Sequence, residues 1–154
     1  MKMQDAVVLW ALSVLALGVG GCAGRTSLFP NSDGNLRKTS AEFAADAAKR
    51  TYPANAPRGG EAPAQAAIDH GVLNRIEMSN LSGDNWSNVE LWVNQKYVVA
   101  IPEWPSKRLE QINFQMLFDR DGRNFPIDNK TYRVEKIELV RDGKLYSVPS
   151  RLAD

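Results

Sequence analysis

The sequence predicts an all-β fold, a small antiparallel β-sandwich of immunoglobulin-like type. Apolar and polar residues alternate with a period of two along several short stretches after residue 67. Turn-forming Asp, Asn, Gly and Pro residues separate these stretches, and no helical period lies between them. Six or seven short strands joined by tight turns are typical of a sandwich, and a small barrel is the alternative.

The first three strands are expected between residues 76 and 101. The inward-facing residues of the first two strands are apolar at every second position: Ile76, Met78, Val89, Leu91 and Val93. Trp92 lies on the opposite face of the second strand. The third strand, 97–101, follows a short hairpin turn. Pro102 and Pro105 are expected to end it and to bracket an exposed loop that carries Trp104.

The remaining strands complete the two sheets. The fourth strand has the clearest alternation, with four inward-facing residues: Ile112, Phe114, Met116 and Phe118. A fifth strand is expected at 132–140, with a bulge between Val134 and Ile137 where the inward parity shifts. The Asp-Gly pair within 141–144 predicts a type I′ hairpin turn, so that 145–148 pairs back.

One short helix is expected before the sandwich. Thr39 and Glu42 have the spacing of a capping box, and a helix of about residues 40–51 should follow. Its apolar stripe consists of Phe43, Ala44, Ala47 and Ala48. Pro53 ends the helix. The sequence leaves open whether such a short helix packs on the β domain or on a partner, or is only partly formed.

The composition on either side of this helix indicates tethers. Residues 25–37 are rich in Asn, Ser, Gly and Asp, which favours a solvated chain. Residues 52–66 are rich in Pro, Ala and Gly and are expected to form an extended spacer that marks a domain boundary. The predicted organisation is therefore a signal segment at 1–21, a tether with the helix at 22–66, and a β-sandwich domain at 67–154.

The N-terminus has the layout of an export signal. Lys2 precedes an apolar run at 6–17, and small residues follow. The run is too short for a membrane span, which needs about 20 apolar residues. The last four residues of the signal, Val19-Gly20-Gly21-Cys22, resemble the lipobox of bacterial lipoproteins. An ordinary signal peptide or an uncleaved anchor is the alternative.

The resemblance implies a lipid anchor at Cys22. In that family the cysteine sulfur is diacylated, the signal is removed, and the new amino group is acylated, commonly with palmitate. Cys22 is the only cysteine in the chain, so no disulfide partner competes for it. Three acyl chains would hold the protein stably on a membrane. Ala23 stands where Asp would favour inner-membrane retention, which implies an outer-membrane protein facing the periplasm if the organism is Gram-negative.

The charge balance and the residue types argue against several classes of function. The chain has 19 Lys and Arg, 18 Asp and Glu, and a net charge of +1, which is not typical of a nucleic-acid-binding protein. His70 is the only histidine, so no His-based catalytic or zinc site is expected, and no metal or cofactor is predicted. The acidic turn with Asp119, Asp121 and Gly122 does not have the spacing of a calcium loop and is expected to be a plain hairpin turn.

Four aromatic residues are the candidate binding residues. Trp86, Trp92, Tyr97 and Trp104 lie in predicted turns, loops and strands, and together they would offer an exposed surface for a glycan or a peptide. The alternative is that they cover the open ends and the second face of the sandwich.

The sequence therefore predicts a lipid-anchored cell-envelope protein of structural or protein-interaction type that is not an enzyme. Its expected partners are the membrane, through Cys22, and an envelope protein or glycan, with no nucleic acid. The first alternative is a glycan- or peptide-binding module that uses the four aromatic residues. The second is a small envelope hydrolase with carboxylates such as Glu103 or Asp128.

Overall fold

The structure is a computed structural model that describes residues 36–152. The predicted signal segment, the lipidation site Cys22 and most of the first tether lie outside the described residues. In chain order the elements are α1 (Ser40–Ala48), β1 (Arg58–Glu61), β2 (Ala64–Asp69), β3 (Arg75–Asn80), β4 (Trp86–Val93), β5 (Tyr97–Trp104), β6 (Leu109–Asn113), η2 (Phe114–Met116), β7 (Ile137–Arg141), β8 (Lys144–Ser147) and β9 (Ser150–Leu152).

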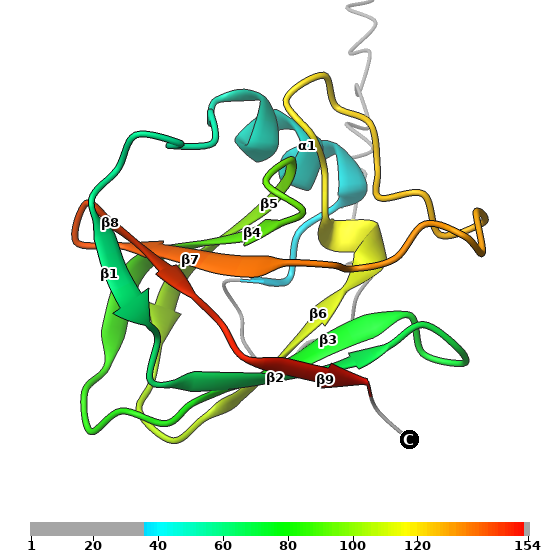
Figure 1. Cartoon of the computed structure of the whole chain (residues 1–154). Helices are drawn as coiled ribbons and strands as arrows, with labels where there is room; N and C mark the ends of the chain where they lie inside the picture. The colour runs from blue at the N-terminus through cyan, green and yellow to red at the C-terminus, as the bar shows by residue number, and fades with distance from the viewer. Residues whose placement is uncertain (1–35, 153–154) are drawn as a thin grey trace, which may run out of the picture.

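The strands form two sheets (Figure 1), and the apolar core lies between them. One sheet has the order β1-β8-β7-β4-β5, and the other has the order β6-β3-β2-β9. Inward-facing residues such as Ile76, Met78, Leu91 and Ile112 are fully buried. The predicted all-β sandwich is confirmed. Most strand pairs are antiparallel, as expected, but β1 pairs with β8 and β2 pairs with β9 in parallel.

The two parallel pairs join the sheets. β1 leads into β2 and β8 leads into β9, and both connections pass from the five-stranded to the four-stranded sheet side by side (Figure 1). Ala62 N donates to Ser147 O at 2.8 Å, and Ala66 N donates to Pro149 O at 2.9 Å. The Pro- and Ala-rich stretch 52–66, expected to be a spacer, therefore contains β1 and the start of β2. Residues far along the chain hold its backbone in an extended conformation, although its own composition does not favour strands.

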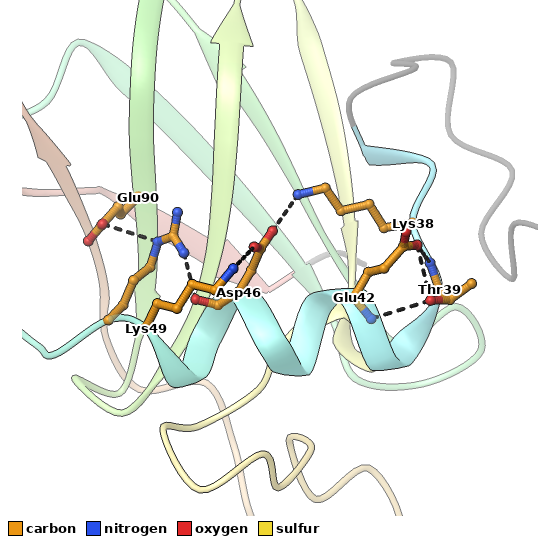
Figure 2. A network of polar contacts seen from close by, with 7 residues as sticks. Lys38, Thr39, Glu42, Asp46, Lys49 and Glu90 are labelled. Carbon is orange, nitrogen blue, oxygen red and sulfur yellow. Dashed lines mark hydrogen bonds and ion pairs between the residues drawn. The ribbon is translucent and has the colours of Figure 1, made fainter.

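Helix α1 docks on the sandwich, which answers the question that the sequence left open. The capping box is confirmed, because Glu42 N donates to Thr39 Oγ1 at 3.3 Å and Thr39 N donates to Glu42 Oε2 at 2.8 Å (Figure 2). Phe43 and Ala47 are buried in the core. After the helix, Arg50 Nε lies 3.2 Å from Glu90 Oε1 on β4, so an ion pair fixes the end of the helix to the sheet.

A buried carboxylate also fastens the segment after the helix. Glu138 on β7 accepts from Tyr52 Oη at 2.6 Å and from Arg58 Nη1 at 2.8 Å, and Lys136 Nζ lies 2.9 Å away. Burial alone would raise the pKa of Glu138, but the hydrogen bonds from Tyr52, Lys136 and Gln95 outweigh it and hold that pKa below its ordinary value. Glu138 is therefore a charged structural residue that ties β1 and its approach to the sheet.

Two predicted strand boundaries are wrong. β5 does not end at Pro102 but continues to Trp104, so the expected exposed loop at 102–107 is partly a strand. The proline is tolerated because β5 is an edge strand, which needs no hydrogen bond on its free side. β6 ends at Asn113, whose Oδ1 accepts from Gln115 N at 3.0 Å and caps η2. The apolar residues after Asn113 stay buried without a strand.

The predicted strand at 132–140 begins only at Ile137, and the parity shift is not a bulge. The backbone amides of 134–136 donate to side chains instead of a neighbouring strand, and Lys136 O accepts a backbone hydrogen bond there, from Asn94 N at 2.9 Å just after β4. Asn94 Oδ1 accepts from Glu135 N at 2.8 Å and from Lys136 N at 3.1 Å, and Asn94 Nδ2 donates to Arg133 O at 2.7 Å. By contrast, the hairpin turn at 141–144 is confirmed, with Asp142 and Gly143 at φ 50° and 71°.

Candidate functional site

A groove of about 810 Å³ opens where the ends of β2 and β9 meet the segment before β7. Its apolar lining comes from three elements of the chain: Ile68, Val134 and Leu152. Arg133 and Arg151 also line it, and both are exposed. The groove is thus an opening between the two layers of the sandwich, with an apolar interior and two cationic side chains.

The loop after β2 forms one wall of the groove. Asp69 Oδ1 accepts from Gly71 N at 2.6 Å, and Asp69 Oδ2 accepts from Leu73 N at 3.3 Å. Both carboxylate oxygens therefore accept hydrogen bonds from backbone N–H groups of the same loop, as in an Asx turn. Asn74 closes the loop with φ 48°. This geometry leaves Val72 91% exposed at the groove.

His70 connects this loop to the segment on the other side of the groove. Val134 N donates to His70 Nε2 at 3.1 Å, so this ring nitrogen must be unprotonated. The imidazole also packs on Phe114, with 5.1 Å between ring centroids. Burial lowers the pKa of His70, the charge of Arg133 lowers it further, and Asp69 opposes them. His70, the only histidine of the chain, is thus half-buried and joins two segments.

β9 forms the opposite wall and is an edge strand. It is the last strand in its sheet order, and its three residues are exposed. In the parallel register Leu152 pairs with Ile68, whereas Arg151 pairs with Ala67. Successive residues of a strand point to opposite faces. Leu152 therefore lies on the core side with Ile68, and Arg151 lies on the outer face of the sheet.

The charge of the groove favours an anionic ligand. Arg133 and Arg151 are cationic, the carboxylate of Asp69 is occupied by backbone N–H groups, and His70 is held neutral. An apolar interior beside guanidinium groups suits a ligand that combines an apolar group with a carboxylate. In the part of the chain that the structure describes, no cluster of three or more His, Cys, Asp or Glu residues could hold a metal ion.

The four predicted aromatic binding residues are buried, so the exposed aromatic surface is a wrong prediction. Trp86, Trp92, Tyr97 and Trp104 expose 3%, 2%, 4% and 0% of their surface. Trp86 and Trp104 face each other across β4 and β5, with 5.3 Å between ring centroids. Arg141 lies 4.8 Å over Trp86 and covers it.

The other two aromatic residues are covered in the same way. Trp92 lies edge-to-face with Tyr52 at 5.5 Å, and Tyr97 lies edge-to-face with Phe125 at 5.2 Å. In the register of β4 with β5, Tyr97 pairs with Val93 on the core face, whereas Trp92 pairs with Val98 on the opposite face. The segment before β1 covers Trp92 through Tyr52, and the segment after η2 covers Tyr97 through Phe125. The aromatic residues are therefore packing residues of the sandwich, in line with the alternative that the sequence left open.

The acidic turn is a structural feature. Asp119 Oδ1 accepts from Asp121 N at 3.0 Å and from Arg123 N at 2.8 Å. Burial would raise the pKa of Asp119, but the hydrogen bond from Arg123 N and the nearby charges of Arg123 and Lys96 lower it. Its carboxylate is thus occupied by the turn and by two cations, in keeping with the plain turn expected there.

Sequence reasoning missed the groove residues Val72, Arg133, Arg151 and Leu152. The adjacent apolar pair at 72–73, between Gly71 and Asn74, was the one available signal, since a tight turn exposes such residues. The two arginines are far apart in the sequence, and only the parallel pairing of β2 with β9 and the bonds to Asn94 bring them to one groove. Cys22 lies outside the described residues, and within 36–152 no helix has the length and apolar character to cross a bilayer.

No family model matches the chain, and no curated protein or solved structure matches it either.

Proposed function

We propose that the protein is a lipid-anchored component of the cell envelope that binds another protein through the groove beside β9, without catalysing a reaction. The observation that carries the binding role is the groove itself. It has an apolar interior between the sheets, flanked by Arg133 and Arg151, and Val72 stands almost fully exposed at its wall. Soluble domains seldom leave apolar residues gathered at an opening unless something covers them.

The anchor is proposed from the sequence. The apolar run at 6–17, the small residues before Cys22 and the absence of any second cysteine in the chain support lipidation at that sulfur. The mass of the intact protein from membranes should lack residues 1–21 and include three acyl chains. The Cys22→Ser variant should appear in the soluble fraction. A full-length mass, or a variant that stays on the membrane, would contradict the anchor.

Cross-linking in the native envelope tests the groove. A photoreactive residue at Val72 in the full-length protein should give one discrete protein adduct after illumination. Leu81 is the matched control, because it is an exposed leucine, 57% accessible, outside the groove. A discrete adduct from Val72 but not from Leu81 supports the proposal. Equal adducts from both positions, or none from Val72, would contradict it.

The described structure offers no observation in favour of the two alternatives. The aromatic residues of the glycan-binding alternative are buried. The carboxylates named for the hydrolase, Glu103 on β5 and Asp128 in the segment after η2, are exposed, and neither lines the groove.

A further inference from the structure

We infer that the groove takes an extended segment of the partner protein, which adds to β9 as a further strand and carries alternating apolar and acidic side chains. This inference rests on the proposed function and specifies the chemistry of the partner. It combines the free edge of β9, the register of β9 on β2, and the charges along the groove.

The free edge supplies the backbone contacts. β9 is the terminal strand of the four-stranded sheet, and within residues 36–152 no strand pairs with its outer edge. An edge strand presents N–H and C=O groups that another extended chain can pair with. Proteins often block such edges with a bulge or a proline, but none lies within the three residues of β9. The groove runs along this strand, since all three of its residues line it.

The register supplies the side-chain pattern. A strand added beside β9 continues the same alternation of faces. Its side chains next to Leu152 would enter the apolar interior with Ile68 and Val134, and those next to Arg151 would lie on the outer face. Opposite charges on neighbouring strands stabilise a pair, and like charges destabilise it. The partner segment should therefore alternate apolar residues with Asp or Glu.

Arg133 adds a second cation at the end of the groove nearest His70. Its backbone carbonyl is held by Asn94, and its neighbour Val134 is held by His70. The backbone that carries this guanidinium is thus fixed before the partner arrives, which lowers the entropic cost of binding. A carboxylate at one end of the added strand would lie within its reach.

The test uses the purified full-length protein and a fluorescent eight-residue peptide of alternating Val and Glu, capped at both ends. Fluorescence anisotropy should show binding that weakens with added salt. A peptide with Lys in place of Glu should bind at least about tenfold more weakly, and so should the acidic peptide with the Arg151→Glu variant. Arg120→Glu is the matched control, because it makes the same charge change at an exposed position outside the groove and should leave binding unchanged.

Backbone methylation separates strand addition from simple charge attraction. Two further peptides carry N-methyl groups on the odd or on the even amides, and at least one of them should lose binding because its pairing edge is blocked. If both methylated peptides bind as tightly as the unmethylated acidic peptide, strand addition is overturned. If the Lys peptide binds as tightly as the acidic peptide, the acidic pattern is overturned. A dimer of the protein alone that Arg151→Glu dissociates would assign the edge to a second copy and overturn the inference.

The outcomes also separate this inference from the proposed function. If none of the peptides binds while Val72 still gives its discrete adduct in the envelope, the groove binds a partner of other chemistry, and only the inference fails. If Val72 gives no adduct, the proposed function fails.

Discussion

Asn80 shows how one buried polar side chain can organise two strand ends. It is fully buried at the end of β3. Its Nδ2 donates to Asp84 O at 2.9 Å and to Trp104 O at 3.2 Å, and its Oδ1 accepts from Ser82 N at 3.0 Å. The amide thus needs both its donor and its acceptor. This residue, together with the core, holds Trp104 inside, where the sequence suggested an exposed loop.

Replacing Asn80 with Asp should lower the free energy of unfolding by about 1–3 kcal/mol or more, because the carboxylate keeps the acceptors but faces two carbonyl oxygens without a donor. Asn85→Asp is the matched control. Asn85 is exposed, and its Oδ1 only accepts, from Ser106 N at 2.9 Å, so the change should cost little. Urea unfolding of both variants measures the difference. Similar stabilities for the two would show that the Asn80 donors contribute nothing.

The fold is characterised by the parallel passage of β1-β2 and β8-β9 from one sheet to the other. β1 passes so close to β8 that a Cβ on Gly59 would lie 2.1 Å from Cε1 of Tyr146. Tyr146 has little freedom to move, because it packs against the core and Arg141 lies 5.4 Å over its ring. The glycine is therefore required by close approach rather than by a turn.

Gly59→Ala should reduce stability by about 1–3 kcal/mol, since the added methyl group forces Tyr146 or β1 to shift. Gly83→Ala is the matched control, because a Cβ there meets no atom within 4 Å and the position does not require a positive φ. Thermal unfolding of the two variants gives the comparison. If Gly59→Ala is as stable as Gly83→Ala, the close pairing of β1 with β8 is wrong.

The segment 133–136 is held by side chains, and one of them titrates. The pKa of His70 is lowered in the folded protein, and the groups around it that carry charge are Arg133, Asp69 and Lys130. Above about pH 6.5, the ordinary pKa of a histidine, the ring is neutral in both states and the bond from Val134 N is fully present. As the pH falls from there through the folded pKa, the His70 imidazole binds a proton more readily when it is not bonded to Val134 N. The hydrogen bond from Val134 N to His70 Nε2 therefore weakens.

Amide exchange measured at about pH 7.5 and about pH 5.5 should show a loss of protection at Val134 on acidification. The amides of Glu135 and Lys136 donate to Asn94 and should keep their protection. His70→Gln offers an acceptor that does not titrate, and its Val134 protection should be the same at both pH values. Protection of Val134 in the wild-type protein that does not change with pH would contradict this role of His70.

The elements that the sequence predicted correctly are those whose own residues carry the pattern. The alternation of Ile76 with Met78, the capping box at Thr39 and the Asp-Gly turn at 142–143 are local signals, and the structure has each of them. β1 was missed because Gly and Pro are poor strand formers, and its pairing comes from β8. The strand predicted before Ile137 does not form, because the backbone amides there donate to the side chains of Asn94 and His70 instead of a neighbouring strand.

The candidate site could not be predicted from local signals, because it depends on contacts between residues that are distant in the sequence. Large aromatic residues beside turns suggested an exposed binding surface, but their burial depends on Tyr52, Phe125 and Arg141, which are distant in the sequence. The groove needs residues from β2, β9 and the segment before β7. No local pattern brings those three together, so the site could be found only from the folded chain.

The fold has one covered side and one open side. α1 and the segments around it lie over the ends of β4 and β5, and β9 lies at the edge away from them (Figure 1). On the covered side, α1 packs on the core and the buried Glu138 holds the segment that follows the helix. The free edge of β9 and the groove lie on the other side, where the proposed partner would bind.

A partner that covers the groove beside β9 in the cell envelope should slow the hydrogen exchange of the groove amides. The measurement compares the full-length protein on its native membranes with the purified protein in detergent. We expect added protection on the membranes at the amides of 71–73, 133–134 and 150–152, with no change in the turn at 82–85. Equal exchange of the groove amides in the two samples would show that no partner covers the groove.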